Sequence, residues 1–239
     1  VHHVSNLYYI PNQGALAAWL VKNTAGLDKA FFCNSGGEAN EAAIKLSLKH
    51  AVQERGLKDP VILTAYGSFH GRTMATISAT AQPKYHGPEG CWQVKGLAEH
   101  FEFNDIASLE AAFEKHEVAA ILVEPIQGEG GVRVGTQEFL QKARELCDAS
   151  GALLVFDEVQ CGVGRGARRA DGAAARVGRR RLGDDHARLQ RALHLLRRAH
   201  HARRRAVAAA RRDPRRDRKP RRRGLQGGHA CLLYTSDAA

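Results

Sequence analysis

The sequence predicts an α/β fold in which a mainly parallel sheet carries flanking helices. Short apolar runs suited to buried strands alternate along the chain with longer segments of helical periodicity. Polar, glycine-containing loops follow these runs. Because the carboxyl ends of parallel strands meet at one edge of a sheet, the polar groups of these loops are expected to gather there and form a ligand site. The connections between the strands are expected to be right-handed crossovers.

Helices are expected where apolar residues recur every three or four positions, as Leu16, Trp19 and Leu20 do. Strands are expected where short apolar runs are bounded by turn residues. The expected helices cover residues 13–24, 38–55, a short stretch after residue 73, 106–116 and 137–149. The expected strands cover residues 30–33, 61–63, 118–123 and 153–156, and residues 81–96 are expected to form a loop.

Composition divides the chain near Gly164–Arg165. Residues 1–165 contain 14 Lys and Arg against 19 Asp and Glu, a net charge of −5, whereas residues 166–239 contain 22 against 6, a net charge of +16. These two values sum to the net charge of +11 for the whole chain. We therefore expect residues 1–165 to be an acidic folded domain and residues 166–239 to be an Arg- and Ala-rich, disordered tail.

The cysteines and the hydropathy restrict the setting in which the protein works. The five cysteines form neither a Cys-x-x-Cys pair nor a zinc-like cluster with His, so no metal site is expected and a reducing cytoplasm suits them. No stretch approaches the roughly 18 apolar residues of a membrane span, and no basic-then-apolar leader opens the chain. The chain begins at Val1 without Met, and we expect its N-terminal part to be incomplete.

Asp157 is expected to lie at the carboxyl end of the strand formed by residues 153–156. A carboxylate at the end of a buried strand is costly unless it has a partner. One interpretation gives Asp157 a cation within the protein. The other gives it a cation on a ligand, such as a protonated pyridine nitrogen. The strand alone leaves both interpretations open.

Three further loops carry candidate binding groups. Ser35-Gly36-Gly37 stands at a helix N-terminus, where backbone N–H groups favour a phosphate, although a plain tight turn has the same sequence. Phe69-His70-Gly71-Arg72 offers an aromatic face and a guanidinium for a carboxylate, or else a core Phe and a surface Arg, and His70 is expected to be structural. Glu124 and Glu129 bracket a Gly-rich loop, in which Glu124 is the more constrained because it directly follows a strand.

Taken in order, these motifs resemble those of the class III, fold-type I aminotransferases that use pyridoxal phosphate, most closely the acetylornithine aminotransferase branch. The resemblance covers residues 1–165 and implies a partial pyridoxal-phosphate-dependent transferase-like large domain. Gly37 departs from the family pattern, which usually has Thr or Ala there. The motifs that carry the resemblance are Ser5-Asn-Leu-Tyr8, Phe32-Cys-Asn-Ser-Gly-Gly-Glu-Ala-Asn-Glu-Ala42, Phe69-His-Gly-Arg-Thr73, Val123-Glu-Pro-Ile-Gln-Gly-Glu-Gly-Gly131 and Phe156-Asp-Glu-Val-Gln160.

The resemblance also implies roles for individual residues. The residues expected to bind the cofactor are Gly36, Gly37, Phe69, Asp157, Val159 and Gln160. The two glycines hold the phosphate, while Phe69 and Val159 cover the two faces of the pyridine ring. Asp157 pairs with the ring nitrogen and Gln160 with the ring oxygen. Arg72 binds the substrate carboxylate, and Glu129 lies near the pocket that selects the substrate.

The implied reaction moves an amino group between N-acetylornithine and 2-oxoglutarate in arginine biosynthesis, by a ping-pong route through pyridoxamine phosphate. The implied assembly is a cytoplasmic homodimer with the active site at the subunit interface. Ornithine, succinylornithine and 4-aminobutyrate aminotransferases share most of these motifs and remain alternatives.

The family also requires a lysine that forms a Schiff base with the cofactor, about 25 residues beyond the Asp-Glu-x-Gln motif. Residues 182–190 contain no lysine, and Lys219 is the only one after residue 165. No catalytic lysine is therefore found, and the chain as written is expected to be inactive. One alternative is a non-catalytic fragment that binds the cofactor weakly. Another is a nucleic-acid binder that uses the basic tail, whose affinity would fall with added salt.

The Arg-, Ala-, Gly- and Pro-rich tail has the composition of GC-rich codons, so we predict that it is an out-of-frame translation. Sequencing the encoding DNA across the Gly164 codon should show a second frame that continues the family pattern with a lysine near the expected spacing. A confirmed arginine-rich frame, with no lysine-bearing alternative, would contradict this prediction.

Overall fold

The computed structural model describes residues 8–24, 27–162 and 233–236. The expectations for residues 5–7, for the window 182–190, for Lys219 and for most of the tail lie outside the described residues. No helix in the described parts of the chain is long and apolar enough to cross a membrane.

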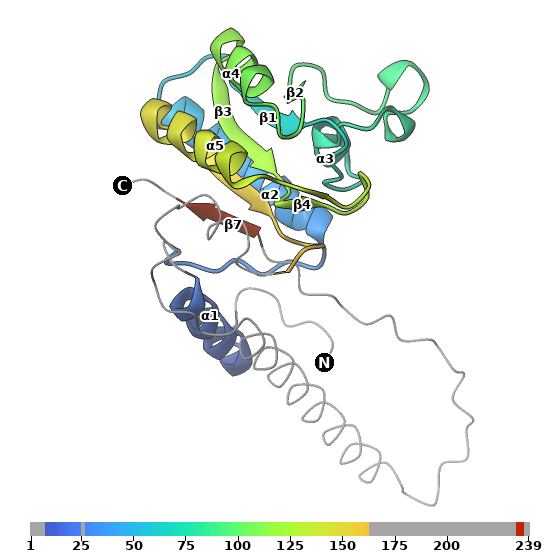
Figure 1. Cartoon of the computed structure of the whole chain (residues 1–239). Helices are drawn as coiled ribbons and strands as arrows, with labels where there is room; N and C mark the ends of the chain where they lie inside the picture. Colours follow the sequence, from blue (N-terminus) through green and yellow to red (C-terminus); the bar gives the residue numbers. More distant parts are fainter. Residues whose placement is uncertain (1–7, 25–26, 163–232, 237–239) are drawn as a thin grey trace, which may run out of the picture. The chain divides into compact units, whose positions relative to one another are not determined.

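A five-stranded sheet lies at the centre of the fold, with strand order β2-β1-β3-β6-β7 (Figure 1). The strands are β1 (Val61–Ala65), β2 (Ala98–Phe101), β3 (Val118–Val123), β6 (Leu153–Asp157) and β7 (Leu233–Ser236). The first four run parallel, and β7 pairs antiparallel with β6. The predicted mainly parallel sheet is therefore confirmed. A short antiparallel hairpin, β4 (Ile126–Gln127) with β5 (Arg133–Val134), follows β3.

Helices cover both faces of this sheet (Figure 1). The helices are α1 (Pro11–Asn23), α2 (Gly36–Gln53), α3 (Met74–Ala79), α4 (Ile106–Lys115) and α5 (Gln137–Ser150), with short 3-10 turns at Pro83–Tyr85 and Pro88–Gly90. Helix α2 packs on one face through Ala43, Ile44 and Ala51, which contact apolar residues of β1, β3 and β6. Helices α4 and α5 pack on the other face through residues such as Leu109 and Phe139.

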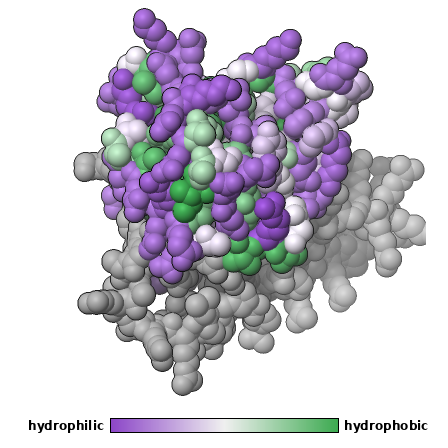
Figure 2. Space-filling view, turned by 45° about the horizontal axis from the view of Figure 1, so that its top comes forward, coloured by the Kyte–Doolittle hydropathy of each residue, from purple (hydrophilic) through white to green (hydrophobic). Residues whose placement is uncertain are grey.

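Strand β3, at the middle of the sheet, is enclosed on every side because it pairs with β1 and β6 and carries a helix layer on each face. All six of its residues are buried, as expected of a continuous apolar strand in a parallel sheet. The outer surface differs in character. The face shown in Figure 2 is covered mainly by hydrophilic side chains, with apolar ones in small groups.

The start of α2 is fixed by its own side chains, and this determines where the helix meets the sheet edge. Ser35 is the N-cap, and its hydroxyl oxygen accepts the N–H of Glu38 at 3.2 Å. The carboxylate of Glu38 in turn accepts the N–H of Asn34 at 2.6 Å. This reciprocal arrangement resembles a capping box. The N–H groups of Gly36 and Gly37 lie in the first turn of the helix and therefore have no intrahelical acceptor.

The described strands differ from the expectations in three places. Residues 30–33 form no strand, and Phe31 is 63% exposed rather than buried, because an apolar run becomes a strand only where a partner edge is available. Strand β2 was not predicted, because it is a short edge strand whose sequence, Ala-Glu-His-Phe, is half polar. Within the tail, residues 233–236 are not disordered, since they pair with β6 as β7.

The packing of the two helix layers predicts that a Leu→Ala substitution changes the free energy of unfolding much more at a buried position than at an exposed one. Leu109→Ala in α4 removes a fully buried side chain and should lower the free energy of unfolding by about 2–5 kcal/mol. Leu46→Ala in α2 truncates a side chain that is 56% exposed and should change it by no more than about 1 kcal/mol. Urea denaturation of both variants measures the difference, and equal losses would contradict this packing.

Candidate functional site

A cavity of about 180 Å³ opens where β1, β3 and β6 end, beside the first turn of α2. Its lining residues are Gly36, Gly37, Asn40, Phe69, His70, Gly71, Glu124, Asp157, Val159 and Gln160. All six residues that the sequence predicts as cofactor-binding are among them. The loops after β1, β3 and β6 therefore gather at one edge of the sheet, as expected.

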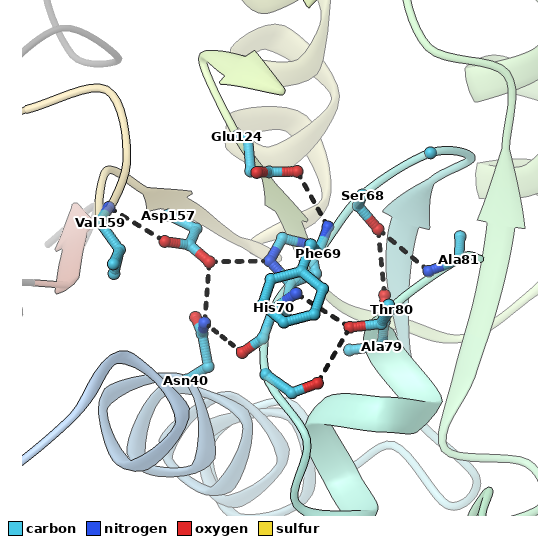
Figure 3. A network of polar contacts seen from close by, with 12 residues as sticks. Asn40, Ser68, Phe69, His70, Ala79, Thr80, Ala81, Glu124, Asp157 and Val159 are labelled. Carbon is cyan, nitrogen blue, oxygen red and sulfur yellow. Dashed lines mark hydrogen bonds and ion pairs between the residues drawn. The ribbon is translucent and has the colours of Figure 1, made fainter. Parts of the chain in front are cut away.

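Asp157 is the most heavily hydrogen-bonded group in the cavity, and its side chain is only 5% exposed (Figure 3). Its Oδ2 accepts from Nδ2 of Asn40 at 2.8 Å and contacts Nδ1 of His70 at 2.9 Å. Its Oδ1 accepts the backbone N–H of Val159 at 3.1 Å. An ionised carboxylate can only accept, so Nδ1 of His70 carries the hydrogen.

These partners decide the charge of Asp157. Burial alone raises the pKa of the Asp157 carboxyl, because it penalises the charged form. The hydrogen bond and the charge of His70, with the bonds from Asn40 and the Val159 N–H, outweigh burial and hold the pKa below its ordinary value of 3.8. The cavity therefore contains an ionised carboxylate at neutral pH. Asp157 thus has partners within the protein, as the first interpretation requires, and it also lines the cavity, where a ligand cation stays a prediction.

The first turn of α2 supplies backbone donors to the lining through Gly36 and Gly37. The loop after β1 comes so close to this turn that a Cβ at Gly71, where φ is +136°, would lie 3.1 Å from the Cα of Gly37. Glycine at position 71 is therefore required both by conformation and by space. A Cβ at Gly37 would meet only the Ser35 hydroxyl oxygen, at 3.8 Å, so the fold would accept the Thr or Ala of the family pattern.

Phe69, Val159 and Gln160 line the cavity from two different loops. The Phe69 ring meets the ring of Tyr85 edge-on, with the centroids 5.2 Å apart, and this contact limits the orientations open to Phe69. The side chain of Gln160 packs on Gly128, where a Cβ would come within 2.3 Å of the amide oxygen. Gly128 therefore allows the loop after β3 and the loop after β6 to meet.

Glu124 is the second buried carboxyl in the lining, at 3% exposure, and it is the more constrained of the two glutamates of its loop, as predicted. Its Oε2 accepts the backbone N–H of Phe69 at 3.1 Å (Figure 3). Burial, opposed by the charge of His70 and assisted by that of Asp157, raises the pKa of Glu124 to about 7. This carboxyl can therefore gain or lose a proton near neutral pH.

Arg72 and Glu129, the predicted substrate-binding residues, do not line the cavity but gather beside it on Tyr85. The guanidinium carbon of Arg72 lies 5.4 Å from the centroid of the Tyr85 ring and 6.0 Å from that of Phe69. The Tyr85 hydroxyl donates to Glu129 at 2.6 Å, and Nζ of Lys84 donates to the same oxygen at 3.3 Å. The structure therefore connects both residues to the cavity wall through the Tyr85–Phe69 contact.

Sequence reasoning missed Asn40 and Tyr85 and did not connect His70 with Asp157. A signal for Asn40 was present, because it occupies the buried side of α2 together with the apolar Ala43 and Ile44. A polar residue on an otherwise apolar helix face usually has a specific hydrogen-bond partner. His70 is 2% exposed and bound to Asp157, in keeping with its predicted structural role.

Comparison with known proteins gives one family for most of the chain. The family model for class III aminotransferases matches residues 1–168. An acetylornithine aminotransferase from Thermosynechococcus vestitus is 55% identical over 173 residues, which cover 69% of this chain and 40% of that protein. The chain thus spans about 40% of the length of this curated relative.

Solved structures agree in fold. The N-acetylornithine aminotransferase from Stenotrophomonas maltophilia has 41% identity and a TM-score of 0.54, covering 68% of this chain and 38% of its own. The ornithine aminotransferase from Toxoplasma gondii has 28% identity and a TM-score of 0.64, covering 70% and 41%. The Toxoplasma structure is described as having partial occupancy of pyridoxal phosphate at its active site.

The raised pKa of Glu124 predicts a stability that falls with pH. Below pH 4.5 the carboxyl is protonated in both states, whereas between pH 4.5 and about 7 the unfolded state ionises first. The free energy of unfolding should therefore drop by up to about 3 kcal/mol over this range and then level off. Glu124→Gln should abolish this part of the pH dependence of the free energy of unfolding, as measured by urea denaturation between pH 4 and pH 8.

Glu114→Gln, at an exposed position of α4, is the matched control and should keep the pH dependence of the original chain. Identical pH profiles for the original chain and Glu124→Gln would show that Glu124 ionises normally.

Proposed function

Since the chain belongs to the class III aminotransferase family, we propose that residues 1–165 are the cofactor-binding part of an acetylornithine aminotransferase. The intact enzyme would move an amino group between N-acetylornithine and 2-oxoglutarate with pyridoxal phosphate as cofactor. The 55% identity to the Thermosynechococcus vestitus enzyme supports this substrate. Because the chain spans about 40% of that relative, the activity of the whole enzyme is part of the proposal.

The observation that carries the proposal is the convergence of six separate candidates on one cavity. They come from the start of α2, the loop after β1 and the loop after β6, which are more than 120 positions apart at the extremes. Packing alone gives no reason for a helix N-terminus, an aromatic ring and a buried ionised carboxylate to share one cavity. A ligand with an anionic group, a flat ring and a cationic N–H does give such a reason.

Pyridoxal phosphate has these three features, and the residues present fit it. The first-turn N–H groups of Gly36 and Gly37 have no intrahelical acceptor and would donate to the phosphate. Phe69 and Val159 would contact the two faces of the ring, and Gln160 its oxygen. Asp157, kept ionised by its neighbours, would accept the N–H of the ring nitrogen and hold that nitrogen protonated. When bound, a protonated pyridoxal ring supplies the electron sink for charge developed at the substrate's α-carbon.

Arg72 and Glu129 would act on the substrate side of the ring. A guanidinium binds a carboxylate through two parallel hydrogen bonds, which suits the α-carboxylate of an amino acid. The Arg72 guanidinium is exposed and lies against the Phe69 and Tyr85 rings, beside the cavity. Glu129, whose carboxylate accepts the Tyr85 hydroxyl, would contribute to the choice of amino donor.

The finer assignments rest on the family. Arginine biosynthesis, a cytoplasmic location and a homodimer with a shared active site are proposed with the substrate. Ornithine, succinylornithine and 4-aminobutyrate remain alternative amino donors. The fold likeness to the ornithine aminotransferase of Toxoplasma gondii, at 28% identity, keeps ornithine under consideration.

The chain as written is proposed to bind the cofactor without completing the reaction. The family lysine that exchanges protons with the substrate has no counterpart at the expected spacing. Lys219 is the only lysine after residue 165, and the sequence around it does not resemble the family. Binding through Gly36, Asp157 and Phe69 needs no lysine. The non-catalytic fragment therefore remains the second candidate function, with reversible binding that dialysis would undo.

Calorimetric titration of the full chain with pyridoxal phosphate tests the proposal. We expect saturable binding that Asp157→Asn weakens by about 10- to 100-fold, the equivalent of one hydrogen bond to a charged group. Asp148→Asn, which alters an exposed carboxylate paired with Arg144 within α5, is the matched control and should bind normally. Absence of binding to the original chain, or equal binding by Asp157→Asn, would refute the proposed site.

A further inference from the structure

The Asn40 side chain joins three separate segments of the cavity wall through one amide group. It is 1% exposed and belongs to the second turn of α2. Its Nδ2 donates to Oδ2 of Asp157 at 2.8 Å, at the end of β6 (Figure 3). The same nitrogen donates to the backbone oxygen of His70 at 2.8 Å, in the loop after β1.

The orientation of this amide follows from its partners. A carboxylate and a backbone carbonyl only accept hydrogen bonds, so the NH2 end of Asn40 must face them. Both hydrogens of this NH2 group are thereby used. The other end, Oδ1, is buried and has no hydrogen-bond partner among the described residues. Asn40 is therefore held in place by its two donated bonds alone.

The position of Asn40 on α2 gives these bonds a further consequence. Gly36 and Gly37 form the first turn of the same helix, and Asn40 follows one turn later. A helical turn is stiff, because its backbone is fixed by hydrogen bonds. The amide of Asn40 therefore ties the Asp157 carboxylate to the helix whose first turn carries the backbone donors of the cavity.

We propose that Asn40 is a positioning residue that holds Asp157 in register with the first turn of α2, so that one ligand can engage both ends of the cavity at once. This inference rests on the proposed function, because it takes the ligand to be pyridoxal phosphate. Asn40 acts through Asp157 and need not touch the ligand. It also supplies one of the three hydrogen bonds that support the negative charge of Asp157.

A purely structural role for Asn40 makes a different prediction. If its amide only closed the loop at His70, removing it would loosen the whole cavity and weaken every ligand alike. If it positions Asp157, the loss falls on ligands that carry a ring nitrogen. Benzyl phosphate has the phosphate arm and a flat ring but no nitrogen, so it reports on the phosphate and ring contacts without the contact to Asp157.

The test titrates the full chain with pyridoxal phosphate and with benzyl phosphate. Asn40→Leu keeps the branched shape of the side chain, with a larger volume, and removes both donors, and Asn40→Ala serves if the leucine disturbs packing. Both variants should bind pyridoxal phosphate about tenfold more weakly and benzyl phosphate within about twofold of the original chain. The matched control is Ser47→Ala, a buried α2 position whose hydroxyl has no partner among the described residues, and it should bind both ligands normally.

Equal losses for the two ligands, or no loss for either, would overturn the inference. Failure of the original chain to bind pyridoxal phosphate would instead count against the proposed function. In that case a ligand-free measurement still decides the role of Asn40. Carbon-13 NMR of the Asp157 carboxyl should show a higher pKa in both Asn40 variants and no change in Ser47→Ala.

His70 and Glu124 are the other titratable groups whose charges act on Asp157, and both remain in every variant. A shift confined to the Asn40 variants therefore reports the lost amide bond. An Asp157 pKa that stays unchanged in those variants would overturn the inference without any ligand.

Discussion

The burial of the Asp157 carboxylate is the constraint on which the rest of the site depends. A charge that is 5% exposed is tolerable only with several hydrogen-bond donors, and here they come from α2, from the loop after β1 and from the turn after β6. Each donor belongs to a different element, so satisfying one carboxylate fixes three segments relative to one another. The cavity lies among these three segments and the end of β3, which contributes Glu124.

The sheet makes this convergence possible. Parallel pairing of β1, β3 and β6 brings the ends of all three strands to one edge of the sheet. Helix α2 packs on one face of this sheet, and its first turn lies near that edge. Gly71 then allows the loop after β1 to approach the first turn of α2 more closely than a residue with a Cβ would permit. The strands thus determine which loops meet, and this glycine determines how closely two of the segments meet.

Local signals in the sequence predicted most of the alternation of strands and helices and the loops that reach the cavity, whereas the family resemblance supplied Val159 and Gln160 as cofactor candidates. Glycine before a helix and a carboxylate after an apolar run can be recognised within a few residues. The edge strand β2 and the partnership of Asn40 with Asp157 could not be predicted in this way. Strand β2 exists because the edge of β1 is available to it, and Asn40 lies 117 positions from its partner. Both depend on tertiary contacts that no short window of sequence contains.

The protonation of Glu124 should also make ligand binding in the cavity depend on the pH of the solvent. Glu124 lies in the cavity wall, and the backbone of the loop that carries Phe69 and His70 donates to it. A phosphate-bearing ligand brings negative charge close to a carboxyl whose pKa is about 7, which favours the protonated form. Binding near neutral pH would then take up protons from the medium. The heat of binding would consequently depend on the ionisation enthalpy of the buffer, and the apparent affinity would depend on pH even though the groups proposed to bind the phosphate are backbone amides.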